Sequence, residues 1–307
     1  MRIVRTLDAF PSDARPSVVA LGVFDGVHLA HRAILDRAVA RARQGGGTAV
    51  ACTFDPHPAE VLQPDRAPLP IMTLDERLTL IAVSGIALSV VVPFTPAVAA
   101  IEPETFVTDI LGGQLGAREV VVGFNHRFGH RARGDAALLR EVGARVGLHA
   151  EIVPPMDVDG TPVSSSAIRA ALQRGDVAGA ARMLGRPYFV AGEVVEGAGR
   201  GRVLGFATAN LAPERPLLTP PGVYACRFVV DGANHAAVVN AGVRPTFEEK
   251  VFTIEAHLLD FTGDLYGRRA RLDFVARVRE ERKFPSVEAL KAQVALDVEE
   301  ARRALAS

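Results

Sequence analysis

Two histidines, His28 and His31, stand directly after a glycine-bearing turn and are separated by two residues. The apolar run Val18–Leu21 precedes the turn and predicts a strand that is buried on both faces. An amphipathic run to Arg43 follows and predicts a helix. The unpaired N–H groups at a helix start attract anions, and imidazoles placed there add side-chain donors. The pair therefore favours a phosphate-binding site, whereas a lone histidine would more often only pack.

Further polar side chains follow the ends of two other predicted strands. His57 lies between two prolines after the strand Thr48–Phe54, and Asn125 follows the strand Glu119–Val122 in a cationic loop. Ligands of open parallel sheets bind beyond the carboxyl ends of the strands. For His57, loop packing and ligand contact are equally open. Two histidines of the cationic loop are expected to be exposed, His126 and His130.

A run of serines precedes an apolar-periodic segment. Ser164 and Ser165 suit the N-cap of a helix, and for serines alone capping is the better interpretation. Arg169 lies one turn further along, where its guanidinium can reach a phosphate at the helix start. The combination supports a second interpretation, which is a contact with the phosphate tail of a nucleotide.

The second half of the chain places oxygen donors on predicted strands. Thr208 and Asn210 follow a glycine-rich loop, and their hydroxyl and amide oxygens can ligate Mg²⁺ beside nucleotide phosphates. Glu255 shares a strand face with Thr253 and His257 by alternation. This carboxylate is either a surface group or the general base for a substrate hydroxyl, and the pattern alone leaves both open.

The elements that position the first set of residues alternate between strands and helices. Strands are predicted at 18–21, 48–54, 86–92, 119–122 and 149–153. Helices are predicted from His31 to Arg43, from Thr73 as N-cap to Ala82, from about Glu104 to Leu111, from Ala136 to Val146, and as a pair that ends at Leu184 and is broken at Gly175. This alternation is typical of a doubly wound, parallel α/β sheet.

The pattern changes after Gly185–Tyr188, which we interpret as the boundary between a domain of residues 1–185 and a domain of residues 186–307. The second domain has short predicted strands and a hairpin turn at Asp231-Gly232, which favours a small antiparallel barrel. The strands are expected at 189–195, 223–230, 236–239, 252–259 and 270–278. A closing helix, 286–306, is predicted with one apolar face, made of Val287, Leu290, Val294, Val298 and Ala301.

Composition excludes several classes of function. The 307 residues include 35 basic and 35 acidic side chains without a long like-charge block, so we expect neither nucleic-acid nor membrane binding. The start lacks the apolar stretch of a signal peptide. The two cysteines, Cys52 and Cys226, indicate buried thiols in a reducing cytoplasm rather than a disulfide or a zinc site. No lysine lies in a Walker P-loop, so phosphate binding must use histidine, arginine, backbone N–H groups and a metal ion.

Four motifs of the first half occur in a fixed order. They are GVFDGVHLAH from Gly22 to His31, TFDPHP from Thr53 to Pro58, GFN with RFG between Gly123 and Gly129, and SSSAIR from Ser164 to Arg169. Together they resemble the adenylyltransferase module of prokaryotic bifunctional riboflavin kinase/FAD synthetases.

The second half carries its own ordered motifs. They are GRG from Gly199 to Gly201, LGFATANL from Leu204 to Leu211, PGVY from Pro221, NAGVRPTF from Asn240, DLYG from Asp264, and REERKF from Arg279 to Phe284. These resemble the riboflavin kinase module of the same family. The resemblance covers nearly the whole chain, and although each motif alone is only moderately specific, the ordered set is highly specific.

The resemblance implies two reactions that both need Mg²⁺. Riboflavin and ATP give FMN and ADP in the C-terminal barrel, and FMN and ATP give FAD and pyrophosphate in the N-terminal domain. The implied ligands are therefore riboflavin, FMN, FAD and ATP, while protein partners remain unpredicted.

The resemblance also assigns roles to individual residues. Glu255 falls at the catalytic base, while Thr208 and Asn210 fall at the positions that hold Mg²⁺ and ATP phosphates. The adenylyltransfer residues are His28, His31 and Asn125. The implied ATP or phosphate contacts are Gly22, Phe24, Asp25, His57, Ser164, Ser165, Arg169, Gly199 and Gly201. The implied flavin contacts are Phe54, Arg279 and Phe284.

Two positions depart from the family pattern. Ala30 replaces the usual glycine of HxGH, and its methyl group crowds a close approach between backbone and ligand. Ala207 replaces the usual proline of PTAN, which loosens the strand entry by about 1 kcal/mol. An alternative is thus a riboflavin kinase whose adenylyltransferase activity is weak or absent because of Ala30. Another is a non-catalytic flavin or nucleotide sensor, which retention of the histidine pair and Glu255 argues against.

Overall fold

The computed structural model describes residues 1–196, 208–245 and 250–306. The chain divides into two compact units, 1–165 and 166–307. By contacts the helices that follow Ser165 thus group with the barrel, whereas the boundary expected between the functional domains lies at 185/186. That functional boundary stays a prediction.

The first unit is built on a six-stranded parallel sheet with the strand order β1-β4-β3-β2-β5-β6. All five strands expected in this half are present. The strand that the sequence did not predict is β1, which is short and pairs with β4 at the edge of the sheet. The strands are β1 (Arg2–Val4), β2 (Ser17–Leu21), β3 (Thr48–Asp55), β4 (Leu88–Pro93), β5 (Ala117–Gly123) and β6 (His149–Val153).

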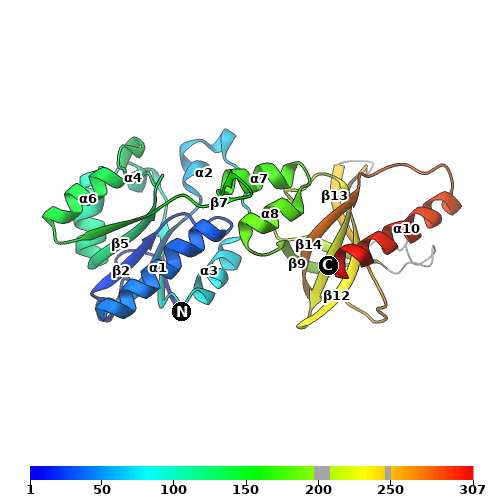
Figure 1. Cartoon of the computed structure of the whole chain (residues 1–307), viewed down its shortest axis with the longest axis horizontal. Helices are drawn as coiled ribbons and strands as arrows, with labels where there is room; N and C mark the ends of the chain where they lie inside the picture. The colour runs from blue at the N-terminus through cyan, green and yellow to red at the C-terminus, as the bar shows by residue number, and fades with distance from the viewer. Residues whose placement is uncertain (197–207, 246–249, 307) are drawn as a thin grey trace. The chain divides into compact units, whose positions relative to one another are not determined.

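Helices cover both faces of this sheet, as a doubly wound fold requires (Figure 1). Helices α1 (Leu29–Gly45) and α3 (Leu74–Val83) pack on one face. The π-helix η3 (Phe106–Gln114) and α6 (Ala136–Arg145) pack on the other. The helix expected near 104–111 is therefore a short α5 (Pro103–Thr105) that continues into the π-helix. The shorter elements are η1 (Ser12–Ala14), α2 (Pro58–Leu62), η2 (Pro64–Arg66), α4 (Pro96–Ala99), η4 (His130–Ala132) and the strands β7 (Asp157–Val158) and β8 (Thr161–Pro162).

Local chemistry explains where these helices begin and end. Thr73 caps α3 in a capping box with Glu76, as the sequence predicts. Gly46 ends α1 in the left-handed region with a φ of 66°, which glycine adopts without a Cβ penalty. The cap of α1 is unusual because it is a histidine, His28.

The second unit is a closed antiparallel barrel with the strand order β10-β13-β12-β11-β14-β9, preceded by a helix pair. The turn between β11 and β12 has a positive φ at both Asp231 and Gly232, as a tight hairpin demands. The elements of the helix pair, the barrel and the closing helix are α7 (Ser165–Gln173), α8 (Val177–Leu184), β9 (Tyr188–Val195), β10 (Thr208–Pro213), β11 (Gly222–Val230), β12 (Ala233–Pro245), β13 (Lys250–Leu258), β14 (Arg269–Arg279) and α10 (Val287–Ala306). The antiparallel barrel and the closing helix are both as predicted, although β10 is not among the strands expected above.

Helix α10 packs on the outer face of the barrel through Ala301, against Val223 and Val238. The predicted apolar face is wrong at its first position, because Val287 is 49% exposed. The buried face of α10 also includes a charged residue that the prediction left out, because Asp297 is only 2% exposed. This buried carboxylate pairs with Arg279 of β14.

Candidate functional site

A strained turn presents the histidine pair at the carboxyl end of β2. Phe24 and Val27 have positive φ angles of 56° and 36°, which are uncommon for side chains of their size. Such strain gathers at sites where the surrounding structure dictates the backbone. The turn delivers His28 to the N-terminus of α1, where its Nδ1 accepts the backbone N–H of His31 at 3.2 Å. Because Nδ1 accepts this bond, neutral His28 carries its proton on Nε2.

The two imidazoles form a compact stack at the helix start. The ring centroids of His28 and His31 are 3.5 Å apart, with the planes inclined by 16°. Burial, followed by electrostatic interactions with His28 and Arg77, holds the pKa of His31 well below its usual range. His31 is therefore neutral near pH 7 and offers one N–H and one acceptor nitrogen.

Phe24 packs against the histidine stack, and Asp25 makes hydrogen bonds that fix the turn before it. The Phe24 side chain is fully buried and meets the His31 ring edge to face, with centroids 5.3 Å apart. The Asp25 carboxylate accepts a hydrogen bond from the backbone N–H of Ile71 at 3.0 Å. The backbone carbonyl of Asp25 accepts one from the Ser165 hydroxyl at 2.8 Å. Ser165 of the serine motif thus contacts the histidine turn directly.

Arg77 is a member of this site that the sequence analysis missed. Its guanidinium is buried and donates to the carbonyl oxygens of Val23, at 2.7 Å, and Phe54, at 3.1 Å. It thereby ties the turn after β2 to the end of β3. The signal was available, because Arg77 lies three residues after Leu74 and four before Ile81 on the apolar face of α3.

The remaining first-half candidates lie in several settings. His57 caps α2, with its Nδ1 accepting the N–H of Ala59 at 3.1 Å. Asn125 is exposed in the turn after β5, at the same edge of the sheet as the turn after β2. Gly22 continues β2 and lies against the Phe24 ring. Ser164 directly precedes α7, and Arg169 is buried on that helix in the second unit, so its contact with a phosphate stays a prediction.

An apolar pocket of about 270 Å³ opens beside the carboxyl ends of β2, β3 and β4. Phe54, predicted to contact flavin, lines this pocket and meets Phe94 edge to face at 5.6 Å. Phe106, His126 and Phe128 also line it. The other lining residues are Leu21, Val23, Pro58, Leu62, Val98, Ala99, Arg127, Gly129 and Ala132.

The expectation that His126 is an exposed loop residue is wrong. Its ring stacks on Phe128, and its Nε2 is buried without a hydrogen-bond partner among the described residues. Burial lowers the pKa of His126 to about 4. His130 in the same loop stays partly exposed and contacts Glu102 at 3.1 Å.

Strand register assembles the second-half candidates into one row on the barrel. Asn210 of β10 lies directly opposite Glu255 of β13, which in turn lies opposite Asn240 of β12. Direct cross-strand partners share a face, so these three side chains are neighbours. Asn240 lies opposite Val223, which packs with α10, so the row is on the outer face of the barrel. The predicted alternation of Glu255 with buried Ile254 is confirmed.

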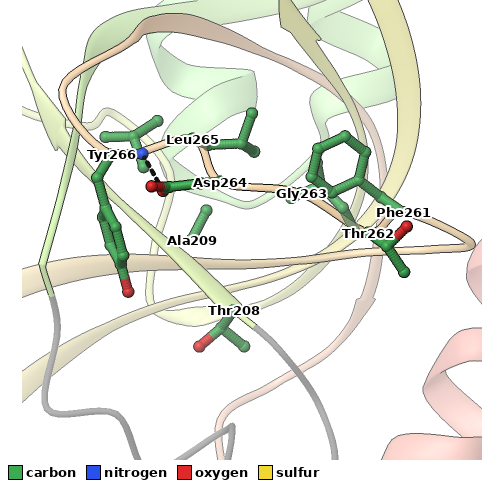
Figure 2. Close-up of a pocket in the computed structure, with 10 residues that line it drawn as sticks. Thr208, Ala209, Phe261, Thr262, Gly263, Asp264, Leu265 and Tyr266 are labelled. Atoms are coloured by element: carbon green, nitrogen blue, oxygen red, sulfur yellow. Dashed lines mark hydrogen bonds between the residues drawn. The ribbon is translucent and has the colours of Figure 1, made fainter.

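Thr208 lies beside this row and also borders a pocket. It pairs with His257 and lines a cavity of about 470 Å³ together with residues 261–266 (Figure 2). The Asp264 carboxylate accepts the backbone N–H of Tyr266 at 3.0 Å and so fixes the loop across from Thr208. Gly199 and Gly201, predicted to lie over the phosphates, are outside the described residues, as is Ala207.

The two predicted flavin contacts of the second half, Arg279 and Phe284, lie against each other, and Arg279 also contacts α10. The Arg279 guanidinium makes a double hydrogen bond to the buried Asp297 carboxylate, at 2.8 and 2.7 Å. It also lies over the Phe284 ring, 5.5 Å from the centroid. Arg279 pairs with Val223 at the end of the row that contains Glu255.

The described residues contain neither a cluster of typical metal ligands nor a helix suited to span a membrane. No group of three or more His, Cys, Asp or Glu side chains there could hold a metal ion. None of the helices in the described part of the chain combines the length and hydropathy needed to cross a membrane.

Comparison with known proteins gives two family matches. A model described as FAD synthetase matches residues 10–167, and one described as riboflavin kinase matches residues 184–305. A bifunctional riboflavin kinase/FMN adenylyltransferase from Bacillus subtilis is 36% identical over 94% of this chain and 92% of its own. One from Pseudomonas fluorescens is 37% identical over 98% and 97%.

A solved structure matches over almost the same length. It is described as a macrolide-efflux protein from Streptococcus pneumoniae, is 29% identical, and covers 98% of both chains with a TM-score of 0.89. That description concerns the Streptococcus protein, and the likeness adds support for the fold.

Proposed function

This chain belongs to the bifunctional riboflavin kinase/FMN adenylyltransferase family, and we propose that the two sets of candidate residues divide its two reactions between them. The protein is a flavin-cofactor enzyme that phosphorylates riboflavin to FMN and adenylylates FMN to FAD. The kinase assignment rests on the strand register, in which Asn210 lies opposite Glu255. The adenylyltransferase assignment rests on the stacked His28 and His31 at the start of α1.

In the first unit, a phosphate oxygen of FMN attacks the α-phosphorus of ATP, and pyrophosphate leaves with the electrons of the broken bond. FMN already carries an anionic nucleophile, so this step needs charge stabilisation more than a base. Nε2–H of His28 and the N-terminus of α1 supply it, with neutral His31 stacked behind. Asn125, Ser164 and Ser165 are assigned to placing the phosphates.

The apolar pocket beside β3 is assigned to the isoalloxazine ring of FMN. Its aromatic lining by Phe54, Phe106 and Phe128 suits a flat, largely apolar heterocycle. The pocket shares Leu21 and Val23 with the strand and turn that lead to His28. A flavin held there would thus have its phosphate end directed along the edge that bears the histidines.

In the second unit, Glu255 takes the proton of the ribityl 5′-hydroxyl while that oxygen attacks the γ-phosphorus of ATP, and ADP leaves. The neighbouring Asn210 amide supports this assignment, because it can orient the carboxylate or a phosphate oxygen. The cavity that Thr208 borders is assigned to the nucleotide. Arg279 and Phe284 are assigned to the flavin.

Mg²⁺ fits the donors that this unit offers. Thr208 and Asn210 supply a hydroxyl and an amide oxygen, which are hard ligands of the kind that Mg²⁺ prefers. Mg²⁺ usually takes few protein ligands and several phosphate or water oxygens, which accords with the lack of a histidine or carboxylate cluster among the described residues. Bound with ATP, it would neutralise charge on the transferring phosphate. The buried, unpaired thiols of Cys52 and Cys226 support a cytoplasmic location.

One experiment tests the division of labour. Riboflavin, ATP and Mg²⁺ are incubated with the protein, and the flavins are separated by chromatography. We expect FMN first and FAD after it. FMN that accumulates without FAD would favour a kinase whose adenylyltransferase is disabled at Ala30, and the absence of both products would contradict the proposal.

A further inference from the structure

The apolar pocket of the first unit contains one buried side-chain nitrogen that has no hydrogen-bond partner among the described residues. That atom is Nε2 of His126. Among the residues that line the pocket, the only other ionisable side chain is Arg127, which is 59% exposed and pairs with Asp135 at 3.4 Å. His126 is therefore the buried hydrogen-bonding side chain of this pocket.

The imidazole of His126 is held in place from two sides. Its backbone N–H donates to the carbonyl of Gly123 at 3.0 Å, which fixes the turn. Its ring lies nearly parallel to Phe128, with centroids 5.9 Å apart and planes inclined by 18°. Phe128 is fixed in turn by Gly134, where a Cβ would come within 2.7 Å of the Phe128 ring. The direction of Nε2 is thus set by packing.

An unsatisfied buried nitrogen is costly, and native structures rarely keep one without a reason. Burial also lowers the pKa of His126 to about 4, so the ring is neutral near pH 7. A neutral imidazole in an apolar pocket is a selective contact, because only a ligand with a hydrogen-bonding edge recovers the lost bond. A ring with an apolar edge would leave it unpaired.

We propose that His126 hydrogen-bonds through Nε2 to the pyrimidine edge of the flavin ring and so determines how FMN enters the pocket. This inference rests on the function proposed above. The pyrimidine end of isoalloxazine carries two carbonyl oxygens and an N–H group, whereas the dimethylbenzene end carries no polar atom. A single buried Nε2 therefore distinguishes the two ends and fixes the orientation of the ring. His126 is a specificity-determining residue, distinct from the histidine pair at the phosphates.

The test compares His126→Phe with the unaltered protein. Phenylalanine keeps an aromatic ring against Phe128 but makes no hydrogen bond. We expect the KM for FMN in FAD formation to rise about 5- to 20-fold, with kcat changed less than about twofold, since one hydrogen bond is lost from the bound flavin. The KM for riboflavin in phosphorylation should not change. His130→Phe, in the same loop but outside the pocket, is the matched control and should leave both KM values unchanged.

A flavin analogue identifies the edge of the ring and needs no variant. A methyl group on N3 of FMN removes the N–H of the pyrimidine edge and crowds the carbonyl oxygens on either side of it. The unaltered protein should bind 3-methyl-FMN about 5- to 20-fold more weakly than FMN, and His126→Phe should bind the two equally. Equal binding of the two flavins by the unaltered protein, or an unchanged KM for FMN in His126→Phe, overturns the inference alone. If the unaltered protein makes no FAD from FMN and ATP, the proposed function fails instead.

Discussion

Asn210 and Glu255 are direct cross-strand partners on the outer face of the barrel. They are 45 residues apart in the chain, and only the pairing of β10 with β13 brings them together. The same pairing places Thr208 beside His257. The register thus brings a hydroxyl, an amide and a carboxylate to the same face of two neighbouring strands, which is the observation behind the proposed kinase site.

The first prediction concerns this carboxylate. Glu255→Gln keeps the size of the side chain but removes its basicity, so riboflavin phosphorylation should fall by about 100-fold or more. FAD formation from supplied FMN should not change, because the histidine pair, His28 and His31, lies in the other unit. Separate assays with riboflavin and with FMN measure the two rates.

Glu193→Gln is the matched control for this change. Glu193 is an exposed carboxylate on β9, which neighbours β10 in the same barrel. Its substitution should leave both rates within about twofold, as expected for a surface position. A Glu255→Gln protein that phosphorylates riboflavin at the normal rate would remove Glu255 from the role of base.

The second prediction concerns the ion pair between Arg279 and Asp297. Their side chains are 19% and 3% exposed, and Gln293 also donates to the Asp297 carboxylate. Asp297→Asn leaves the guanidinium without its counter-charge, so the second unit should lose about 3 kcal/mol of unfolding free energy. The KM for riboflavin should rise as well, because Arg279 is assigned to the flavin.

Tyrosine fluorescence can follow this loss selectively. The chain has no tryptophan, and its three tyrosines, Tyr188, Tyr224 and Tyr266, all lie in the second unit. Asp260→Asn is the control, since its pair with Arg302 is exposed at 50% and 74% and should contribute less than about 1 kcal/mol. If Asp297→Asn and Asp260→Asn unfold at the same urea concentration, burial does not strengthen the pair between Arg279 and Asp297.

The third prediction is an acid sensitivity of the first unit. The pKa of His126 is about 4 in the folded protein, whereas an unfolded histidine titrates near 6.5. Between these values the unfolded chain binds a proton that the folded chain does not. The contribution of His126 to the unfolding free energy is therefore fully present above pH 6.5. It is lost as the pH drops towards 4, by about 3 kcal/mol in total. His31 adds to the fall, because its pKa is lowered too.

Circular dichroism at pH 7 and pH 5 checks this dependence. It reports on both units, so the transition that tyrosine fluorescence does not follow belongs to the first unit. The unfolding free energy of that unit should drop less in His126→Phe than in the unaltered protein, by about 2 kcal/mol between the two pH values. An identical drop in both proteins would show that His126 is not the group that titrates.

Much of the fold follows from local patterns, because strands and helix caps depend on neighbouring residues. The apolar run of β2, the Thr73 cap and the Asp231-Gly232 turn all lie where the sequence predicts them. Strand β1 was missed, because three residues at a sheet edge carry too little periodicity to be recognised. The π-helix was missed because its buried residues, Phe106, Val107, Ile110 and Leu111, also fit the spacing of an ordinary α-helix.

The candidate site was predictable in its residue types but not in its partners. The sequence singled out His28, His31 and Glu255, yet it held no sign that Asn240 joins the row. Buried charges were the other gap, and both Arg77 and Asp297 lie on helix faces that are otherwise apolar. A charge on such a face needs a distant partner, and only the tertiary structure reveals which one.

The last prediction concerns Ala30, the second residue of α1 and part of the turn that carries the histidine stack. Ala30→Gly removes the methyl group beside the N–H groups assigned to the phosphates, so the KM for ATP in FAD formation should fall by about 2- to 10-fold. The helix loses up to about 1 kcal/mol. Ala40→Gly, in the middle of α1, imposes a similar helix cost without touching the turn and should leave this KM unchanged. A KM that stays the same in Ala30→Gly would show that the methyl group does not crowd ATP.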